Sequence, residues 1–155
     1  MNNDAINMTW AFDSQFEAAH DAGAQLRALA TELGFCEVEI PRIELCVHEA
    51  FANAVEHAFG NQPGHRIEVD AIVHGETLEI RICQFGVPLD AAVVTAATVG
   101  FDDLEVPLDA FDCEKRGRGL RIIKVIMDTC EVMQSGDRYC LVMRKPLPTH
   151  SDQAA

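Results

Sequence analysis

Three polar side chains recur at every fourth position near the middle of the chain. Glu49, Asn53 and His57 fall on one stripe of a predicted helix, because positions i, i+4 and i+8 share a face. A carboxylate such as Glu49 can accept the proton of an attacking hydroxyl group. The amide oxygen of Asn53 is a hard ligand of the kind that Mg²⁺ binds. Two interpretations stay open: a solvated polar face of a helix, or one wall of a site for phosphoryl chemistry.

A second segment of interest is Gly117-Arg118-Gly119-Leu120, at the predicted start of a later helix. A helix N-terminus offers unpaired N–H groups and positive potential, and glycine lets a phosphate approach the backbone. Five of the twelve basic residues lie in or beside this segment: Lys115, Arg116, Arg118, Arg121 and Lys124. Cations at a helix N-terminus oppose the helix dipole, so an anion there would explain them. The alternative is that the acidic loop before them neutralises their charge.

A third segment, Gln84-Phe85-Gly86-Val87-Pro88-Leu89-Asp90, follows a predicted strand. By itself it indicates only a turn at the end of that strand.

The elements that must position these residues follow from the hydrophobic periodicity. Alternation predicts strands, and spacings of three and four predict helices. Residues 91–116 lack a clear period, carry six acids from Asp102 to Glu114, and are predicted to form a mobile loop. The predicted order is a strand at 8–12, helices at 16–33 and 41–58, a hairpin at 66–82, the loop, a helix at 117–127 and a hairpin at 130–145. This order favours an α+β two-layer sandwich, with helices on one face of a mixed, mostly antiparallel sheet.

Size and composition limit the function classes. The chain has 155 residues and a net charge of −13, so a direct role in binding nucleic acid or anionic membranes is disfavoured. We expect one domain over residues 1–146 and a disordered tail over 147–155. No secretion signal is evident at the N-terminus, so we expect a cytoplasmic protein whose six cysteines are reduced.

Taken together and in this order, the three segments resemble the GHKL (histidine-kinase-like) ATPase domain of the anti-sigma-factor serine/threonine kinases. The stretch from Glu49 to His57 is similar to the N box of that family. The stretch from Gln84 to Asp90 is similar to its G1 box, and the stretch from Gly117 to Asp128 is similar to its G2 box. The resemblance extends from about Phe12 to Lys145.

The resemblance implies the Bergerat fold with bound ATP and Mg²⁺. By matching position, Glu49 is the general base toward a serine or threonine hydroxyl of a partner, and Asn53 holds Mg²⁺. Residues 91–116 correspond to the lid over the nucleotide. The other residues that the resemblance places around the nucleotide are His57, Gln84, Gly86, Arg116, Gly117, Arg118, Gly119 and Leu120.

The resemblance also implies partners: an anti-sigma-factor antagonist that is phosphorylated, a sigma factor that is sequestered, and a second copy in a homodimer. One position departs from the family pattern, because Gln84 stands where the family has an acid that accepts a hydrogen bond from the adenine amino group. An amide oxygen still accepts, but without charge. Two functions therefore stay open: an ATP-dependent protein kinase, or a binding module of the same fold with little or no kinase activity.

Overall fold

The computed structural model describes residues 6–91 and 115–149, and every structural statement below concerns those residues. Five strands and three α-helices are present, with a short π-helical turn, η1, that continues the second helix. In chain order they are β1 (Asn7–Asp13), α1 (Phe16–Glu32), α2 (Glu39–Asn53), η1 (Ala54–Ala58), β2 (Arg66–His74), β3 (Thr77–Phe85), α4 (Lys115–Ile126), β4 (Thr129–Ser135) and β5 (Arg138–Pro146).

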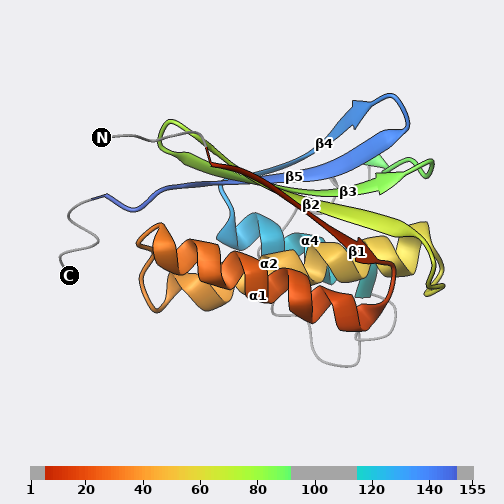
Figure 1. The fold of residues 1–155 in the computed structure, drawn as a ribbon, viewed down its shortest axis with the longest axis horizontal. Coiled ribbons are helices and arrows are strands. Elements are labelled where there is room, and N and C mark those ends of the chain that lie inside the picture. Colours follow the sequence, from red (N-terminus) through yellow and green to blue (C-terminus); the bar gives the residue numbers. More distant parts are fainter. Residues whose placement is uncertain (1–5, 92–114, 150–155) are drawn as a thin grey trace.

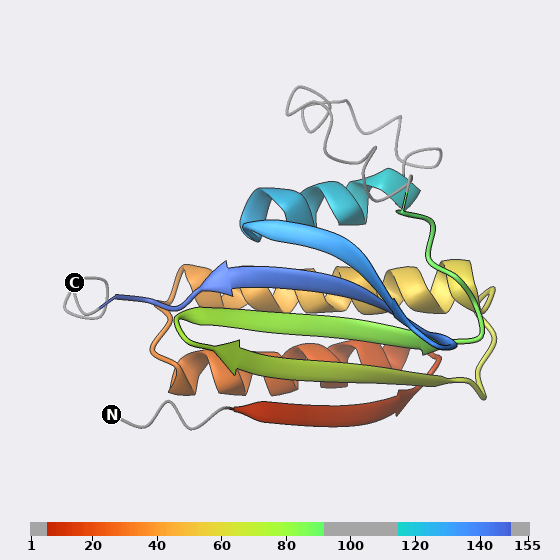
Figure 2. The ribbon, with the colours of Figure 1, turned by 90° about the horizontal axis from the view of Figure 1, so that it is seen from above.

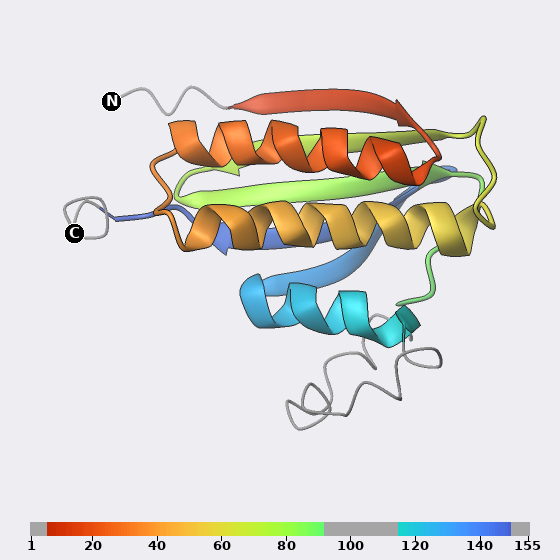
Figure 3. The same ribbon diagram turned by 90° about the horizontal axis from the view of Figure 1, so that it is seen from below.

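The strands form one sheet in the order β1-β2-β3-β5-β4, and the helices cover only one of its faces (Figure 1). The predicted two-layer α+β sandwich is therefore confirmed. The prediction of a mixed sheet is wrong for the described strands, since all four pairings are antiparallel. Figure 2 shows the uncovered face of the sheet, and Figure 3 shows α1 and α2 side by side beneath it, with α4 under the β4 side.

The core lies between the sheet and the helices. Leu26 of α1, Val47 of α2 and Ile80 of β3 are fully buried in it, as the periodicity predicted. Each fully buried side chain of this size contributes about 1.5–3 kcal/mol relative to an exposed one. The stripe of Glu49, Asn53 and His57 lies outside this core: Glu49 and Asn53 are half-buried and His57 is exposed.

Several boundaries differ from the sequence prediction, among them the start of α2 at Glu39 and the end of β3 at Phe85. Helix α4 begins at Lys115, two residues before the predicted Gly117. The second helix ends in a π-helical turn, which hydrophobic periodicity does not reveal. Leu147 donates its N–H to the carbonyl of Glu76 at 2.7 Å and packs against the core. The first residue of the predicted tail is therefore attached to the folded domain. Most of the predicted loop, with the acids Asp102 to Glu114, and residues 150–155 lie outside the described residues.

The uncovered face of the sheet carries a network of ion pairs. Glu79 is 3% exposed, and its carboxylate accepts hydrogen bonds from Arg144 at 2.8 Å and Arg81 at 2.6 Å. Burial alone would raise the pKa of the Glu79 carboxyl, but the hydrogen bonds and charges of the two arginines outweigh burial and hold the pKa below its usual value. Glu79 is therefore ionised at neutral pH and stabilises this face.

The same face holds the one clear departure from the expected cysteine chemistry. Cys83 of β3 and Cys140 of β5 are joined by a disulfide, whereas the composition predicted reduced thiols. The physical reason is the strand register, which places these two residues directly opposite each other although 57 positions separate them in sequence. Cys36, Cys46 and Cys130 are free thiols.

Candidate functional site

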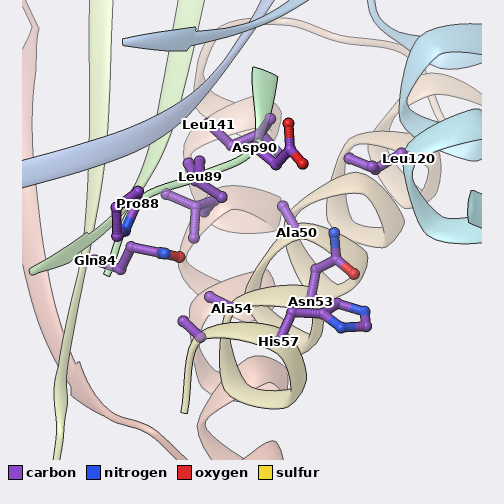
Figure 4. Close-up of a pocket in the computed structure, with 12 residues that line it drawn as sticks. Ala50, Asn53, Ala54, His57, Gln84, Pro88, Leu89, Asp90, Leu120 and Leu141 are labelled. Atoms are coloured by element: carbon purple, nitrogen blue, oxygen red, sulfur yellow. The ribbon is translucent and has the colours of Figure 1, made fainter. Parts of the chain in front are cut away.

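A pocket of about 260 Å³ opens between the second helix, the ends of β3 and β5, and α4 (Figure 4). It contains residues from all three segments that the sequence singled out. Its lining residues are Ala50, Asn53, Ala54, His57, Ala58, Ile82, Gln84, Pro88, Leu89, Asp90, Leu120 and Leu141.

The helix wall of the pocket carries Asn53 and His57. Asn53 is the last residue of α2, and His57 lies in η1. Both project to the pocket side, as Figure 4 shows. Single π-helical turns occur often at functional sites, and here the turn contains His57, the last residue of the polar stripe. The predicted spacing therefore brings two of the three stripe residues into one site.

Gln84 forms the opposite wall, at the end of β3. It is only 2% exposed, and its amide nitrogen donates a hydrogen bond to the carbonyl of Val87 at 2.6 Å. That bond uses the NH₂ group and leaves the amide oxygen pointing into the pocket (Figure 4). Gln84 consequently presents a neutral hydrogen-bond acceptor to whatever occupies the space.

Gly86 belongs to the turn after β3 and does not line the pocket. Its φ of 76° lies in the left-handed region that favours glycine. Its N–H donates to the carbonyl of Asp137 at 2.8 Å, in the turn between β4 and β5. Gly86 thus lets the chain reverse so that Pro88, Leu89 and Asp90 reach the pocket.

Helix α4 contributes Leu120 to the lining, and Leu120 is 2% exposed. Arg116, Gly117 and Arg118 belong to the first turns of this helix, and their side chains lie outside the description. Gly119 lies in the same turns, close to α2.

Glu49 lies beside the pocket and in contact with α4. A Cβ placed on Gly119 would stand 3.0 Å from the carboxylate oxygen Oε2 of Glu49. The absence of a side chain at position 119 therefore lets this carboxylate sit against the first turns of α4. The structure thus brings together Glu49 and Gly119, which the sequence only placed on two separate helices.

The floor of the pocket was missed by sequence reasoning. Ile82 and Leu141 face each other across β3 and β5 and close the pocket from the sheet side. Alternation along β3 could have found Ile82, since it lies two residues from Gln84 on the same face. No local pattern identifies Leu141, because its place depends on the pairing of β3 with β5.

The arrangement suits a flat, largely apolar group that carries a hydrogen-bond donor. Ile82, Leu89 and Leu141 offer apolar surface, and Gln84 offers an acceptor at its edge. The polar atoms of Asn53 and His57 lie toward the helix side. Most small-molecule sites are built in this way, from an apolar lining and a few placed polar groups.

Comparison with known proteins agrees with this geometry. The family described as histidine kinase-like ATPase domain matches residues 12–145. An anti-sigma F factor of Oceanobacillus iheyensis is 26% identical over 133 residues, which cover 84% of this chain and 85% of that protein. A serine-protein kinase RsbW of Listeria monocytogenes serotype 4a is 29% identical over 103 residues, which cover 66% of this chain and 64% of that protein.

A solved structure shares the fold. The crystal structure of the RsbU and RsbW domains of a Mycobacterium tuberculosis protein aligns with a TM-score of 0.61 and 18% sequence identity. The alignment covers 92% of this chain but only 32% of that larger protein. With the family match over residues 12–145, these observations show that the chain belongs to the histidine kinase-like ATPase domain family.

Proposed function

We propose that this protein binds ATP with Mg²⁺ and transfers the γ-phosphoryl group to a serine or threonine of an anti-sigma-factor antagonist. In this proposal it also sequesters a sigma factor, acts as a homodimer and works in the cytoplasm. The observation that carries the proposal is the pocket itself, which joins Asn53, Gln84 and Leu120 and has Glu49 beside Gly119. The names of the anti-sigma F factor and RsbW relatives support the choice of partners.

Base recognition falls to Gln84. Its amide oxygen accepts a hydrogen bond from the exocyclic amine of adenine, while the hydrogen bond to Val87 keeps the side chain in that orientation. Hypoxanthine, the base of inosine triphosphate, has a carbonyl oxygen where adenine has its amine. That oxygen and the amide oxygen of Gln84 are both hydrogen-bond acceptors, so they repel each other. The pocket volume of about 260 Å³ is below the roughly 300–1,000 Å³ of drug-sized sites, so it suits the nucleoside part of ATP.

The residues present fit a magnesium nucleotide. The side chain of Asn53 lines the pocket and provides the kind of oxygen that Mg²⁺ prefers. When bound, ATP with Mg²⁺ supplies the phosphoryl group and a metal that neutralises its negative charge. The backbone of the first turns of α4 offers N–H groups and positive potential to the phosphates.

Glu49 takes the role of general base. Its carboxylate lies against Gly119, next to the place proposed for the phosphates. It accepts the proton of the partner's hydroxyl as the oxygen attacks the γ-phosphorus, the bond to the β-phosphate breaks and ADP leaves. Phosphoryl transfer needs chiefly positioning and charge stabilisation, and general-base catalysis adds typically about 10²–10⁴-fold.

A second function is favoured by one observation, the neutral acceptor at position 84. A hydrogen bond to an ionised acceptor is roughly 1–2 kcal/mol stronger than one to a neutral acceptor, which corresponds to about tenfold in affinity. A protein with this weaker adenine contact could serve as an anti-sigma factor or adaptor with little or no kinase activity. Such a module would bind its protein partner whether or not ATP is present.

The deciding experiment compares three forms of the protein with ATP labelled in the γ-phosphate. Partners are first captured from the native cytosol with and without ATP and Mg²⁺, and the captured antagonist then serves as substrate. We expect the wild type to label it, Glu49→Gln to bind ATP without labelling it, and Glu56→Gln to match the wild type. Glu56 is the matched control, an acid in η1 that does not line the pocket.

Transfer by Glu49→Gln at the wild-type rate would remove Glu49 from the mechanism. Partner capture that is independent of ATP, together with no transfer by the wild type, would favour the binding module.

A further inference from the structure

The disulfide between Cys83 and Cys140 lies directly behind the pocket. The two residues form a cross-strand pair, and their Cα atoms are 4.1 Å apart. Cys83 alternates along β3 with the pocket-lining Ile82 and Gln84, so the pair lies on the opposite face of the sheet, where it forms a small buried cluster with Val142. No described helix covers that face (Figure 2). Cys83 is fully buried and Cys140 is 4% exposed.

The residues that follow each cysteine belong to the pocket. Gln84 comes after Cys83, and Leu141 comes after Cys140. Because side chains alternate along a strand, Gln84 and Leu141 project to the opposite face, where both line the pocket. The covalent bond therefore joins the two strands at the back of the pocket floor.

Two of the three other described cysteines, Cys46 and Cys130, are poorly suited to redox chemistry. Burial raises the pKa of the Cys46 thiol to about 12 and that of the Cys130 thiol to about 11. Both are protonated at neutral pH, and a thiol reacts through its thiolate. Cys36 is exposed, and Cys113 lies outside the described residues.

A cation lies beside the disulfide. Nη1 of Arg138 donates to Sγ of Cys140 at 3.3 Å. The other terminal nitrogen of Arg138, Nη2, donates hydrogen bonds to the carboxylates of Asp70 at 2.8 Å and Glu68 at 3.1 Å. Asp70 and Glu68 offset the charge of this arginine but also fix its position, so that its Nη1–H donates to the sulfur. This hydrogen bond stabilises a thiolate at Cys140, which favours both cleavage of the bond and its return.

We propose that Cys83 and Cys140 form a reversible redox modification site whose state sets the affinity of the pocket for its nucleotide. A small-molecule dithiol is the reductant, since the bond is too deeply buried for contact with a protein. Its thiolate attacks one sulfur, the bond between the two cysteines breaks, and the second thiol of the reductant releases it as a disulfide. The two electrons come from the reductant, and its two protons end on Cys83 and Cys140, directly or through water.

The structural consequence follows from the position of the bond. With the bond present, β3 and β5 are tied covalently at the pocket floor. Without it, β3 and β5 are held together at the pocket floor only by noncovalent contacts, such as the hydrogen bonds of the ladder. A less preorganised pocket binds more weakly, so we expect the oxidised form to bind ATP about threefold to tenfold more tightly than the reduced form. This part rests on the proposed nucleotide function.

The test uses the full-length protein, oxidised with diamide or reduced with dithiothreitol. Because both cysteines are buried, their thiols are counted by alkylation in denaturant followed by mass spectrometry. We expect Cys83 and Cys140 to resist alkylation after oxidation and to be alkylated after reduction. Hydrogen exchange of residues 82–84 and 139–141 needs no nucleotide, and we expect it to be faster in the reduced form. Titration with fluorescent ATP then measures the affinity of each form.

Two variants make the test specific. The double variant Cys83→Ser/Cys140→Ser should behave like the reduced protein under both conditions. Cys36→Ser, an exposed free cysteine, should respond like the wild type.

Three results would overturn the proposal: alkylation of Cys83 and Cys140 after oxidation, unchanged exchange at the pocket floor, or equal ATP affinity of two forms that both bind. A change in exchange without ATP binding by either form would instead refute the nucleotide function and leave the redox site standing.

Discussion

The close approach of Gly119 and Glu49 predicts that Gly119→Ala changes activity and stability in opposite directions. Gly119→Ala adds a methyl group 3.0 Å from Oε2 of Glu49, and 3.6 Å from its Cβ. Nonbonded carbon atoms prefer about 3.5–4.0 Å, so the carboxylate must retreat by a few tenths of an ångström. Replacing a glycine inside a helix with alanine, on the other hand, stabilises the helix by about 0.5–1 kcal/mol.

The expected outcome is a more stable protein in which the proposed phosphoryl transfer is slower. A misplacement of about 1 Å can lower a rate roughly 100-fold, so a shift of a few tenths should lower phosphoryl transfer about threefold to tenfold. The free energy of unfolding, measured by urea denaturation, should rise by up to about 1 kcal/mol. The rate is measured with labelled ATP and the captured antagonist.

A double-mutant cycle isolates the cause. Glu49→Asp shortens the acid by one methylene and makes room for the new methyl group, so adding Gly119→Ala to this variant should cost no further activity. If Gly119→Ala lowers the rate equally in both backgrounds, the contact with Glu49 is not the reason. Loss of phosphate approach to the backbone of α4 would then be the better explanation.

Three further changes test other parts of the structure. Gln84→Asp should bind ATP about tenfold more tightly, because it adds charge to the acceptor, and the gain should be smaller for inosine triphosphate. Fluorescence titration measures both affinities. Weaker ATP binding by the variant would show that the Gln84 amide, held by its hydrogen bond to Val87, is the better ligand. Asn53→Ala should abolish the Mg²⁺ dependence of ATP affinity in calorimetry, and equal wild-type affinity with and without Mg²⁺ would contradict that role. Glu79→Gln should lower the free energy of unfolding at pH 7 by about 1–3 kcal/mol. Because the native pKa of Glu79 lies below the unfolded value, near 4.3, this contribution is present above that pH and is lost as the pH falls through the native pKa. Urea denaturation should therefore show the difference closing in acid, and a constant difference would contradict the ion-pair explanation.

The sequence by itself determined the elements and one wall of the site. Burial on one side of a helix or strand imposes a period on the residues, and that period is local and readable. It predicted α1, the hairpins, and the common stripe of Glu49, Asn53 and His57. It also marked Gln84 as the chemical departure within a stretch of family-like residues.

The tertiary structure decided which residues of different helices and strands contact one another. The pairing of β3 with β5 places Leu141 in the pocket and Cys83 against Cys140, and no residue near either one encodes that register. Contact of α2 with α4 sets Glu49 against Gly119. These relations depend on distances between segments far apart in sequence, which packing of the whole core fixes and local periodicity leaves open.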